Sequence, residues 1–141
     1  ISVAESCTSG LVASKITSIS GSSAYFKGGI IAYQNEIKVN VLGVSQRLID
    51  EKTEVSFEVV EQMALNVQDK FFSDFSIAIS GYAGPLGGTE TKPVGTVFIA
   101  IATHSEVFSR KFYFSGGRES VVNQASGESL RILIEKIKKE E

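Results

Sequence analysis

The apolar segment Phe75–Ile79 is the feature of the sequence that most restricts the fold. It is a nearly continuous apolar run, which is typical of a strand covered on both of its faces. It leads directly into Ser80–Gly95, which contains five of the thirteen glycines and both prolines. Because such a strand needs helices above and below it, the sequence predicts an α/β fold.

Apolar residues recur with strand or helix periodicity in the rest of the chain. The other predicted strands are Ile1–Ala4, Gly28–Tyr33, Thr96–Ala102 and Glu106–Phe114, and the last two are close enough in sequence for an antiparallel hairpin. The predicted helices are one from Leu11 to Gly21, one that Ser45 caps, one that Ser56 caps, and Arg118–Lys138. We therefore expect residues 1–141 to form a single three-layer α/β/α domain with a mixed sheet. A sheet strand is an unusual first element, so we also expect a helix to precede it in a longer chain.

Composition excludes several classes of function. Fourteen basic and sixteen acidic residues give a formal charge of −2, which is not the basic excess of a protein that binds nucleic acid or an anionic membrane surface. With one cysteine, Cys7, and one histidine, His104, neither a disulfide nor a multi-cysteine zinc site is expected. No apolar run approaches the roughly 18 residues of a membrane span, and no signal peptide is recognisable. The sequence predicts a soluble, cytoplasmic protein.

Three polar segments follow predicted strands, and we expect them to meet. They are Glu5–Gly10, Tyr33–Lys38 and Ser80–Gly95. In open α/β sheets, ligands bind beyond the carboxyl ends of the strands, where loops meet helix N-termini. Each loop alone could be a simple connection, but three of them at one edge of the sheet indicate a binding site.

Ser6 is a candidate nucleophile because it lies in a strand-to-helix turn, where amides stabilise negative charge. Thr8, two residues on, is a candidate N-cap of the following helix. The segment lacks the Gly-x-Ser-x-Gly elbow, and His104 lies in a predicted hairpin turn that we expect at the opposite end of the sheet. If a serine is the nucleophile, its base is therefore a lysine, a tyrosinate or another carboxylate.

Other candidate side chains each have two interpretations. Lys38 is an ordinary surface lysine or, if desolvated, a general base. Cys7 is a small buried packing residue or, at a helix N-terminus, an activated thiol. The pair Ser22–Ser23 is a turn that ends a helix or a second hydroxyl site. The sequence alone does not choose between these alternatives.

The segment Gly81–Thr89 has the composition of a phosphate-binding loop but matches neither the Walker A nor the dinucleotide-binding pattern. Its glycines can still expose backbone amides to an anion. Arg118 follows Ser115–Gly117 at a predicted helix start, where a guanidinium is unfavourable for the helix dipole unless an anion offsets it. Both features indicate an anionic ligand.

Together these segments resemble the C-terminal domain of the competence/damage-inducible protein CinA, a family that includes nicotinamide mononucleotide amidases. The resemblance covers almost the whole chain, in the order of the family. It rests on AESCTSGLVAS at 4–14, GSSAYFKGGIIAYQNEIK at 21–38, LGV at 42–44, AISGYAGPLGG at 78–88, KPVGTVFIA at 92–100 and FSGGR at 114–118.

The resemblance implies hydrolysis of nicotinamide mononucleotide to nicotinate mononucleotide and ammonia, without metal or cofactor. It implies catalysis by a serine with lysine and tyrosine support, hence by residues among Ser6, Ser23, Tyr33 and Lys38. The candidate substrate-binding residues are Thr8, Asn35, Gly81, Ala83, Gly84, Gly88, Thr89 and Arg118, of which the Gly81–Gly88 loop, Thr89 and Arg118 are expected to contact the ribose and phosphate. The expected partners are this small molecule and a second copy of the chain in a homodimer.

Two residues depart from the family pattern. Ser9 stands where the family usually has glycine, and Leu86 stands where it usually has aspartate. A Cβ at position 9 can crowd a close backbone approach, and the loss of the carboxylate at position 86 removes an acceptor from the expected pocket. These changes motivate an alternative function, a nucleotide-binding or regulatory module with weakened catalysis. A role in assembly alone is a third alternative.

Overall fold

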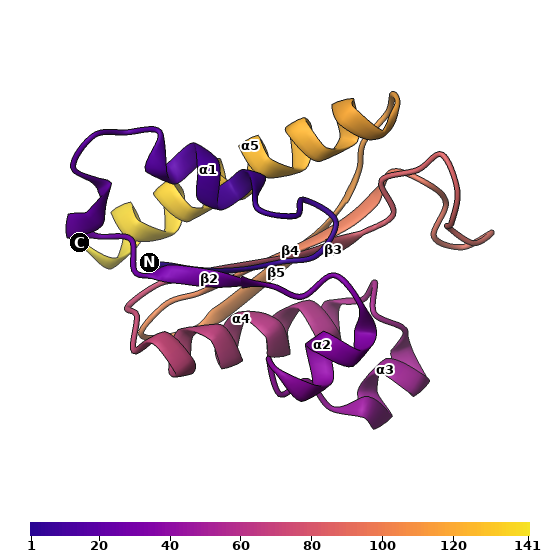
Figure 1. Ribbon diagram of the computed structural model, residues 1–141, viewed down its shortest axis with the longest axis horizontal. Helices are drawn as coiled ribbons and strands as arrows, with labels where there is room; N and C mark the ends of the chain where they lie inside the picture. Colours follow the sequence, from indigo (N-terminus) through magenta and orange to yellow (C-terminus); the bar gives the residue numbers. More distant parts are fainter.

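The computed structural model describes residues 1–141 and shows one central sheet between two layers of helices (Figure 1). The sheet confirms the α/β class that the apolar run at residues 75–79 predicts. In chain order the elements are β1 (Ser2–Glu5), α1 (Leu11–Thr17), the short 3-10 helix η1 (Ser22–Ala24), β2 (Gly28–Ile31), α2 (Asn35–Asn40), α3 (Gln46–Lys52), α4 (Phe57–Phe71), β3 (Ser76–Gly81), β4 (Thr96–Ala102), β5 (Val107–Tyr113) and α5 (Arg118–Glu140).

The order of the strands places a natural crevice at one end of the sheet. The order is β2-β1-β3-β4-β5, in which β1 is parallel to both β2 and β3, and β4 is antiparallel to β3 and β5. The chain leaves β1 towards β2 on one side and returns to β3 on the other. In open α/β sheets, loops diverge at such a reversal and leave space beyond the carboxyl ends of the two strands. Here those ends belong to β1 and β3.

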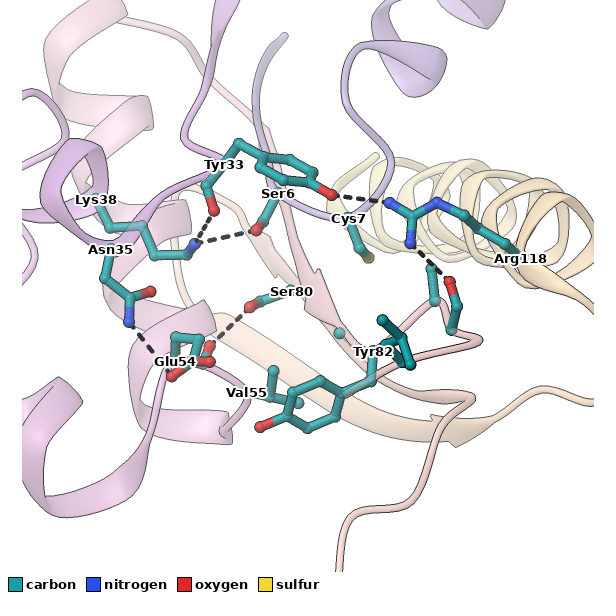
Figure 2. Close-up of a pocket in the computed structure, with 14 residues that line it drawn as sticks. Ser6, Cys7, Tyr33, Asn35, Lys38, Glu54, Val55, Ser80, Tyr82 and Arg118 are labelled. Atoms are coloured by element: carbon teal, nitrogen blue, oxygen red, sulfur yellow. Dashed lines mark hydrogen bonds between the residues drawn. The ribbon is translucent and has the colours of Figure 1, made fainter. Parts of the chain in front are cut away.

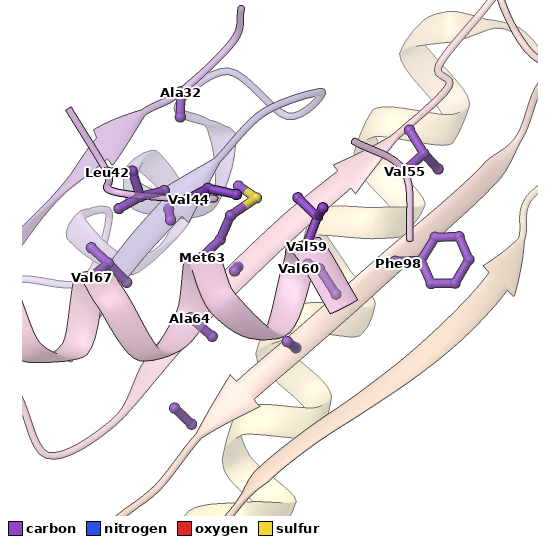
Figure 3. Close-up of a cluster of buried hydrophobic side chains, with 14 of the residues drawn as sticks. Ala32, Leu42, Val44, Val55, Val59, Val60, Met63, Ala64, Val67 and Phe98 are labelled. Carbon is purple, nitrogen blue, oxygen red and sulfur yellow. The ribbon is translucent and has the colours of Figure 1, made fainter. Parts of the chain in front are cut away.

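Alternate residues of β3 and β4 belong to two separate cores, one on each face of the sheet. Ala78, Ala100 and Ala102 of β3 and β4 belong to the same buried cluster as Val60 and Met63 of α4. Figure 3 shows this cluster, with Val60 and Met63 labelled. On the opposite face, isoleucines and valines of the same strands pack against α1 and α5. Successive residues of a strand point to opposite faces, so this alternation gives each helix layer its own core. The strands β3 and β4 are thus buried on both sides, which the sequence predicts for β3.

Several element boundaries differ from the predicted ones, and β2 ends at Ile31 rather than at Tyr33. Strand β3 runs on to Gly81, two residues beyond the apolar run. Helix α1 ends at Thr17 rather than near Gly21, and Ile19, which the helical spacing places on its apolar face, is 60% exposed. The segment 35–40 is a short helix, α2. The predicted β4–β5 hairpin is present, with His104 exposed in its turn.

No helix in the structure combines the length and the apolar character that crossing a membrane requires.

Candidate active site

A cavity of about 220 Å³ lies beyond the carboxyl ends of β1 and β3 (Figure 2). We call it the switch-point pocket. Its lining comes from all three polar segments that the sequence places after strands, together with the α3–α4 connection and the start of α5. The lining residues are Ser6, Cys7, Tyr33, Asn35, Lys38, Glu54, Val55, Ser80, Gly81, Tyr82, Ala83, Gly84, Leu86 and Arg118.

Ser6 and Lys38 are in direct contact at one side of the switch-point pocket. The Nζ atom of Lys38 lies 3.0 Å from Oγ of Ser6 and 3.1 Å from the carbonyl oxygen of Tyr33. Ser6 follows the last residue of β1, and its amide extends the pairing with β3 by donating to the carbonyl of Ile79. The serine is therefore held by the sheet, while the lysine reaches it from α2. Lys38 Nζ and Ser6 Oγ are therefore close enough for a proton to pass from the hydroxyl to the amine.

Of the two interpretations of Lys38, the structure rules out the ordinary surface lysine. Lys38 is only 1% exposed, and no carboxylate lies within ion-pair distance of its amine. Burial lowers the pKa of Lys38 because removal of water penalises the charged form, and the nearby Glu54 carboxylate partly opposes this effect. A lysine with a lowered pKa that touches a serine hydroxyl has the properties of a general base.

The N-terminus of α1 is occupied by Glu5, which corrects two expectations. The buried Glu5 carboxylate accepts hydrogen bonds from the amides of Gly10, Val12 and Ala13 at 2.9–3.2 Å. Thr8 donates to Glu5 at 2.6 Å and does not cap the helix; the N-cap position is Gly10, with no side-chain cap. These amides are therefore unavailable to a ligand, and Thr8 does not line the switch-point pocket.

Arg118 and Tyr33 meet across the mouth of the pocket. Nη2 of Arg118 donates to the hydroxyl of Tyr33 at 2.8 Å, and Nη1 donates to the carbonyl oxygen of Gly84 at 2.7 Å. Both acceptors are neutral, and Arg118 forms no ion pair. The positive charge at the start of α5 is therefore uncompensated by the protein. The phenol of Tyr33 is bonded to Arg118; only the main-chain carbonyl of Tyr33 contacts Lys38.

The glycine-rich loop contributes three of its five predicted contacts. Gly81, Ala83 and Gly84 line the pocket, and the amides of Ala83 and Gly84 donate no hydrogen bond within the protein. Two free amides beside an arginine suit an anion or a developing oxyanion. Gly88 and Thr89 lie outside the pocket, because Thr89 turns back to Lys92 and accepts a hydrogen bond from its amide.

Ser23 lies away from the other candidate residues and does not share a site with Lys38, contrary to the expectation from the resemblance. It is exposed in η1 and lines a separate cavity together with Ile1, Tyr25 and Asp74. That cavity adjoins residues that precede β1 and β3, so it lies at the opposite end of these strands from Ser6. The two serines therefore cannot act on one reacting group, and the geometry favours Ser6.

Of the two interpretations of Cys7, a buried packing residue or an activated thiol, the structure favours the packing residue. It is 6% exposed, and desolvation raises the pKa of its thiol to about 12. A thiol with that pKa is protonated at neutral pH and is a poor nucleophile. It contributes an apolar wall beside Ser6. No group of three or more His, Cys, Asp or Glu side chains is arranged to hold a metal ion.

Glu54 and Val55 line the pocket although no sequence feature marks them, whereas Ser80 and Tyr82 belong to the predicted segment Ser80–Gly95 without being singled out in it. Glu54 and Val55 join α3 to α4, and Ser80 and Tyr82 flank the end of β3. Asn35, which the resemblance selects, lies 3.5 Å from Glu54 through Nδ2 and Oε2. Only the N-cap Ser56 marks where the connection to α4 ends, and nothing in the sequence places that connection opposite β1.

The structure locates the two residues that depart from the family pattern. Ser9 has φ of 42°, in the left-handed region that favours glycine, but it is exposed and does not line the pocket. Leu86 does line the pocket, at its mouth, and is 87% exposed. The unusual serine thus affects the turn that leads into α1, whereas the unusual leucine faces the approaching ligand.

Comparisons with known proteins agree with this arrangement. The family model described as the CinA C-terminal domain matches residues 1–137. A CinA-like protein of Flavobacterium psychrophilum is 52% identical over 139 residues, which are 99% of this chain and 33% of that protein. A CinA-like protein of Geotalea daltonii is 50% identical over 121 residues, 86% of this chain and 29% of that protein. The chain thus spans about a third of the length of these curated relatives.

Solved structures give the same result at the level of the fold. The competence damage-inducible protein A of Klebsiella pneumoniae superposes with a TM-score of 0.93 at 33% identity, covering 96% of this chain and 84% of that one. A competence/damage-inducible protein of Agrobacterium tumefaciens gives a TM-score of 0.91 at 36% identity, covering 94% and 82%. Because the family model matches residues 1–137, nearly the whole of this chain, the chain belongs to the CinA C-terminal domain family.

Proposed function

We propose that this chain is a serine amidohydrolase that converts nicotinamide mononucleotide and water to nicotinate mononucleotide and ammonia. The observation that carries the proposal is the contact of Ser6 Oγ with the buried amine of Lys38 at 3.0 Å. The substrate itself comes from the resemblance to the CinA family. The pocket supports that choice by offering an uncompensated arginine to an anion at its mouth.

In the first half of the reaction, Ser6 attacks the carboxamide carbon while the neutral amine of Lys38 accepts the hydroxyl proton. The resulting oxyanion receives hydrogen bonds from free amides of the pocket, for which Ala83 and Gly84 are the candidates. The ammonium of Lys38 then returns the proton to the nitrogen of the leaving group. The C–N bond breaks, ammonia leaves, and an ester links Ser6 to the nicotinoyl group.

In the second half, water hydrolyses the ester. Lys38 accepts a proton from the water, the hydroxide attacks the same carbon, and the proton returns to Oγ of Ser6 as the C–O bond to the enzyme breaks. The carboxylic acid product then ionises. Arg118 holds the phosphate of the nucleotide through both halves of the reaction, and the Tyr33 hydroxyl orients the guanidinium for that contact.

The direct test is the release of ammonia from nicotinamide mononucleotide by the purified chain, with nicotinate mononucleotide identified as the second product. Two serine variants form a matched pair. Ser6→Ala is expected to lose at least about 10³-fold in kcat, because the covalent intermediate cannot form. Ser23→Ala is expected to retain wild-type kcat because that residue lies in another cavity. Unchanged turnover by Ser6→Ala would overturn the proposal.

The rate is expected to rise with pH through a group whose pKa lies below the ordinary value of a lysine. Burial lowers the pKa of Lys38, and only the unprotonated amine accepts the serine proton. Therefore kcat/KM is low at acidic pH and increases as Lys38 loses its proton. A pH profile of kcat/KM measures this limb. A profile that falls across the same range as pH rises would contradict the role of Lys38 as base.

A second candidate function, nucleotide binding without turnover, is favoured by Ser9. This residue adopts a left-handed conformation that costs a non-glycine residue free energy, in the turn that carries Ser6. Titration calorimetry distinguishes the two functions. Binding of nicotinamide mononucleotide without ammonia release supports the second, and a Ser9→Gly variant that then gains turnover identifies the turn as the cause.

A further inference from the structure

Glu54 is the one carboxylate that lines the switch-point pocket, and the protein does not neutralise it. It forms no ion pair with any lysine, arginine or histidine. Its nearest side-chain donor is the neutral amide of Asn35, at the long distance of 3.5 Å. A half-buried carboxylate without a cation leaves a negative potential in the cavity that a ligand can satisfy.

The backbone on both sides of Glu54 is fixed by the neighbouring elements. Ser80 Oγ, at the end of β3, donates to the Glu54 carbonyl oxygen at 2.7 Å. Lys92 Nζ donates to the carbonyl oxygen of Val55 at 2.5 Å and to Oγ1 of Thr53 at 3.3 Å. The carboxylate is thus carried by a segment that is anchored to the sheet and to the glycine-rich loop. Such anchoring keeps a binding group in place before the ligand arrives.

Glu54 and Arg118 lie on opposite sides of the pocket, with Ser6 between them (Figure 2). Lys38 is the only other ionisable base in the lining, and it must be neutral to accept a proton from the serine. When Lys38 is neutral, the pocket therefore has a positive group, Arg118, on one side of Ser6 and a negative group, Glu54, on the other. A ligand with an anionic group and a cationic group matches this arrangement, whereas a simple anion meets Glu54 as a repulsive charge.

We propose that Glu54 determines specificity by binding the positively charged ring of the substrate while Arg118 binds its phosphate. The inference rests on the proposed function, because the pyridinium ring of nicotinamide mononucleotide carries that charge beside the carboxamide. The carboxylate attracts the cationic ring into contact range of Ser6 and gives no such advantage to a neutral ring. Glu54 therefore selects the oxidised nucleotide over its reduced, dihydropyridine form.

Glu54 also acts on Lys38, and this second effect is separable. The Glu54 carboxylate raises the pKa of Lys38 against the larger effect of desolvation, so its removal shifts the rising limb of the pH profile to lower pH. That shift applies to any substrate, because it changes the base and not the ligand. Recognition of the ring applies only to the charged form. A comparison of two ring forms in the same variant therefore isolates recognition.

The experiment measures kcat/KM and Kd for nicotinamide mononucleotide and for its reduced form, which has the same carboxamide, ribose and phosphate but an uncharged ring. The proteins are the wild type, Glu54→Gln, and Glu58→Gln as a control on an exposed acid of α4 outside the pocket. Intrinsic differences in ring reactivity cancel when each variant is referred to the wild type. Measurements at the pH plateau of each protein remove the effect on Lys38.

Glu54→Gln is expected to reduce the preference for the charged ring about tenfold, equivalent to about 1.4 kcal/mol, and Glu58→Gln to leave it unchanged. An equal loss for both ring forms, or no loss, overturns the role of Glu54 while leaving the amidase proposal intact. If the wild type binds the charged ring without turnover and Glu54→Gln weakens that binding selectively, the amidase proposal fails and the recognition stands. Absence of binding to either form overturns both.

Discussion

Replacing Lys38 with methionine is expected to lower kcat for ammonia release about 10³-fold, the effect of losing a general base in direct contact with its nucleophile. Methionine has nearly the length of the lysine stem and brings no charge into a site that is 1% exposed. The substitution therefore removes the proton acceptor and leaves the packing of α2 on the sheet. The measurement is single-turnover and steady-state release of ammonia from nicotinamide mononucleotide.

The same variant should be at least as stable as the wild type. A buried amine with a lowered pKa disfavours folding at neutral pH, because the unfolded chain binds a proton that the folded chain resists. The stability of the wild type therefore rises as pH increases from the lowered pKa towards the ordinary lysine value, and Lys38→Met removes that dependence. Chemical denaturation at two pH values measures it. Lys70→Met, an exposed lysine of α4, is the control for the change of side chain.

One result would contradict the proposed role of Lys38, and one control is needed to interpret a loss of activity. If Lys38→Met turns over at the wild-type rate, Ser6 needs no contact with this amine and the mechanism is wrong. If the variant loses activity only because it unfolds, its near-ultraviolet circular dichroism and melting temperature will show that loss. A folded Lys38→Met protein that still binds the nucleotide but releases no ammonia separates chemistry from binding.

The location of the pocket could be predicted from the sequence because it depends on strands. The apolar runs predict where β1, β2 and β3 end, and parallel strands end at the same edge of a sheet. The polar residues that follow those runs include Ser6, Lys38 and Gly81, and all three line the pocket. Local periodicity thus suffices for the half of the site that is carried directly by the sheet.

Contacts that depend on tertiary packing could not be predicted in this way. Ser23 lies two residues after Gly21 in a hydroxyl-rich turn, as a site residue could, yet η1 lies at the other end of β1. Glu54 belongs to a connection whose position against β3 is fixed by Ser80 and Lys92, both distant in sequence. The burial of Lys38 likewise arises from the fold around α2, because its neighbours in the sequence include polar residues.

The contacts of Glu5, which contribute to stability, also could not be predicted from the sequence. As the last residue of β1, it reads as the polar start of a loop, but the structure buries its carboxylate at 1% exposure beneath α1. Four donors converge on it: the hydroxyl of Thr8 and the amides of Gly10, Val12 and Ala13. The side chain thus replaces a conventional cap and stabilises the positive end of the α1 dipole from within the core.

Replacing Glu5 with glutamine is expected to reduce the free energy of unfolding by about 3 kcal/mol and the melting temperature by about 10 °C. Glutamine keeps the volume, but its amide group points two N–H donors at a site that already holds four donors. Some of these buried donors then lack a partner, and each costs free energy. Urea denaturation at neutral pH provides the measurement.

Glu119→Gln is the matched control, since Glu119 also lies in the first turn of a helix, α5, but is exposed. Interaction with the helix dipole alone is worth at most about 1 kcal/mol at such a position. A large loss at Glu5 with a small loss at Glu119 therefore assigns the difference to the buried hydrogen bonds. Equal small losses would mean that water replaces the carboxylate at α1. In that case the turn that carries Ser6 does not depend on Glu5 for its position.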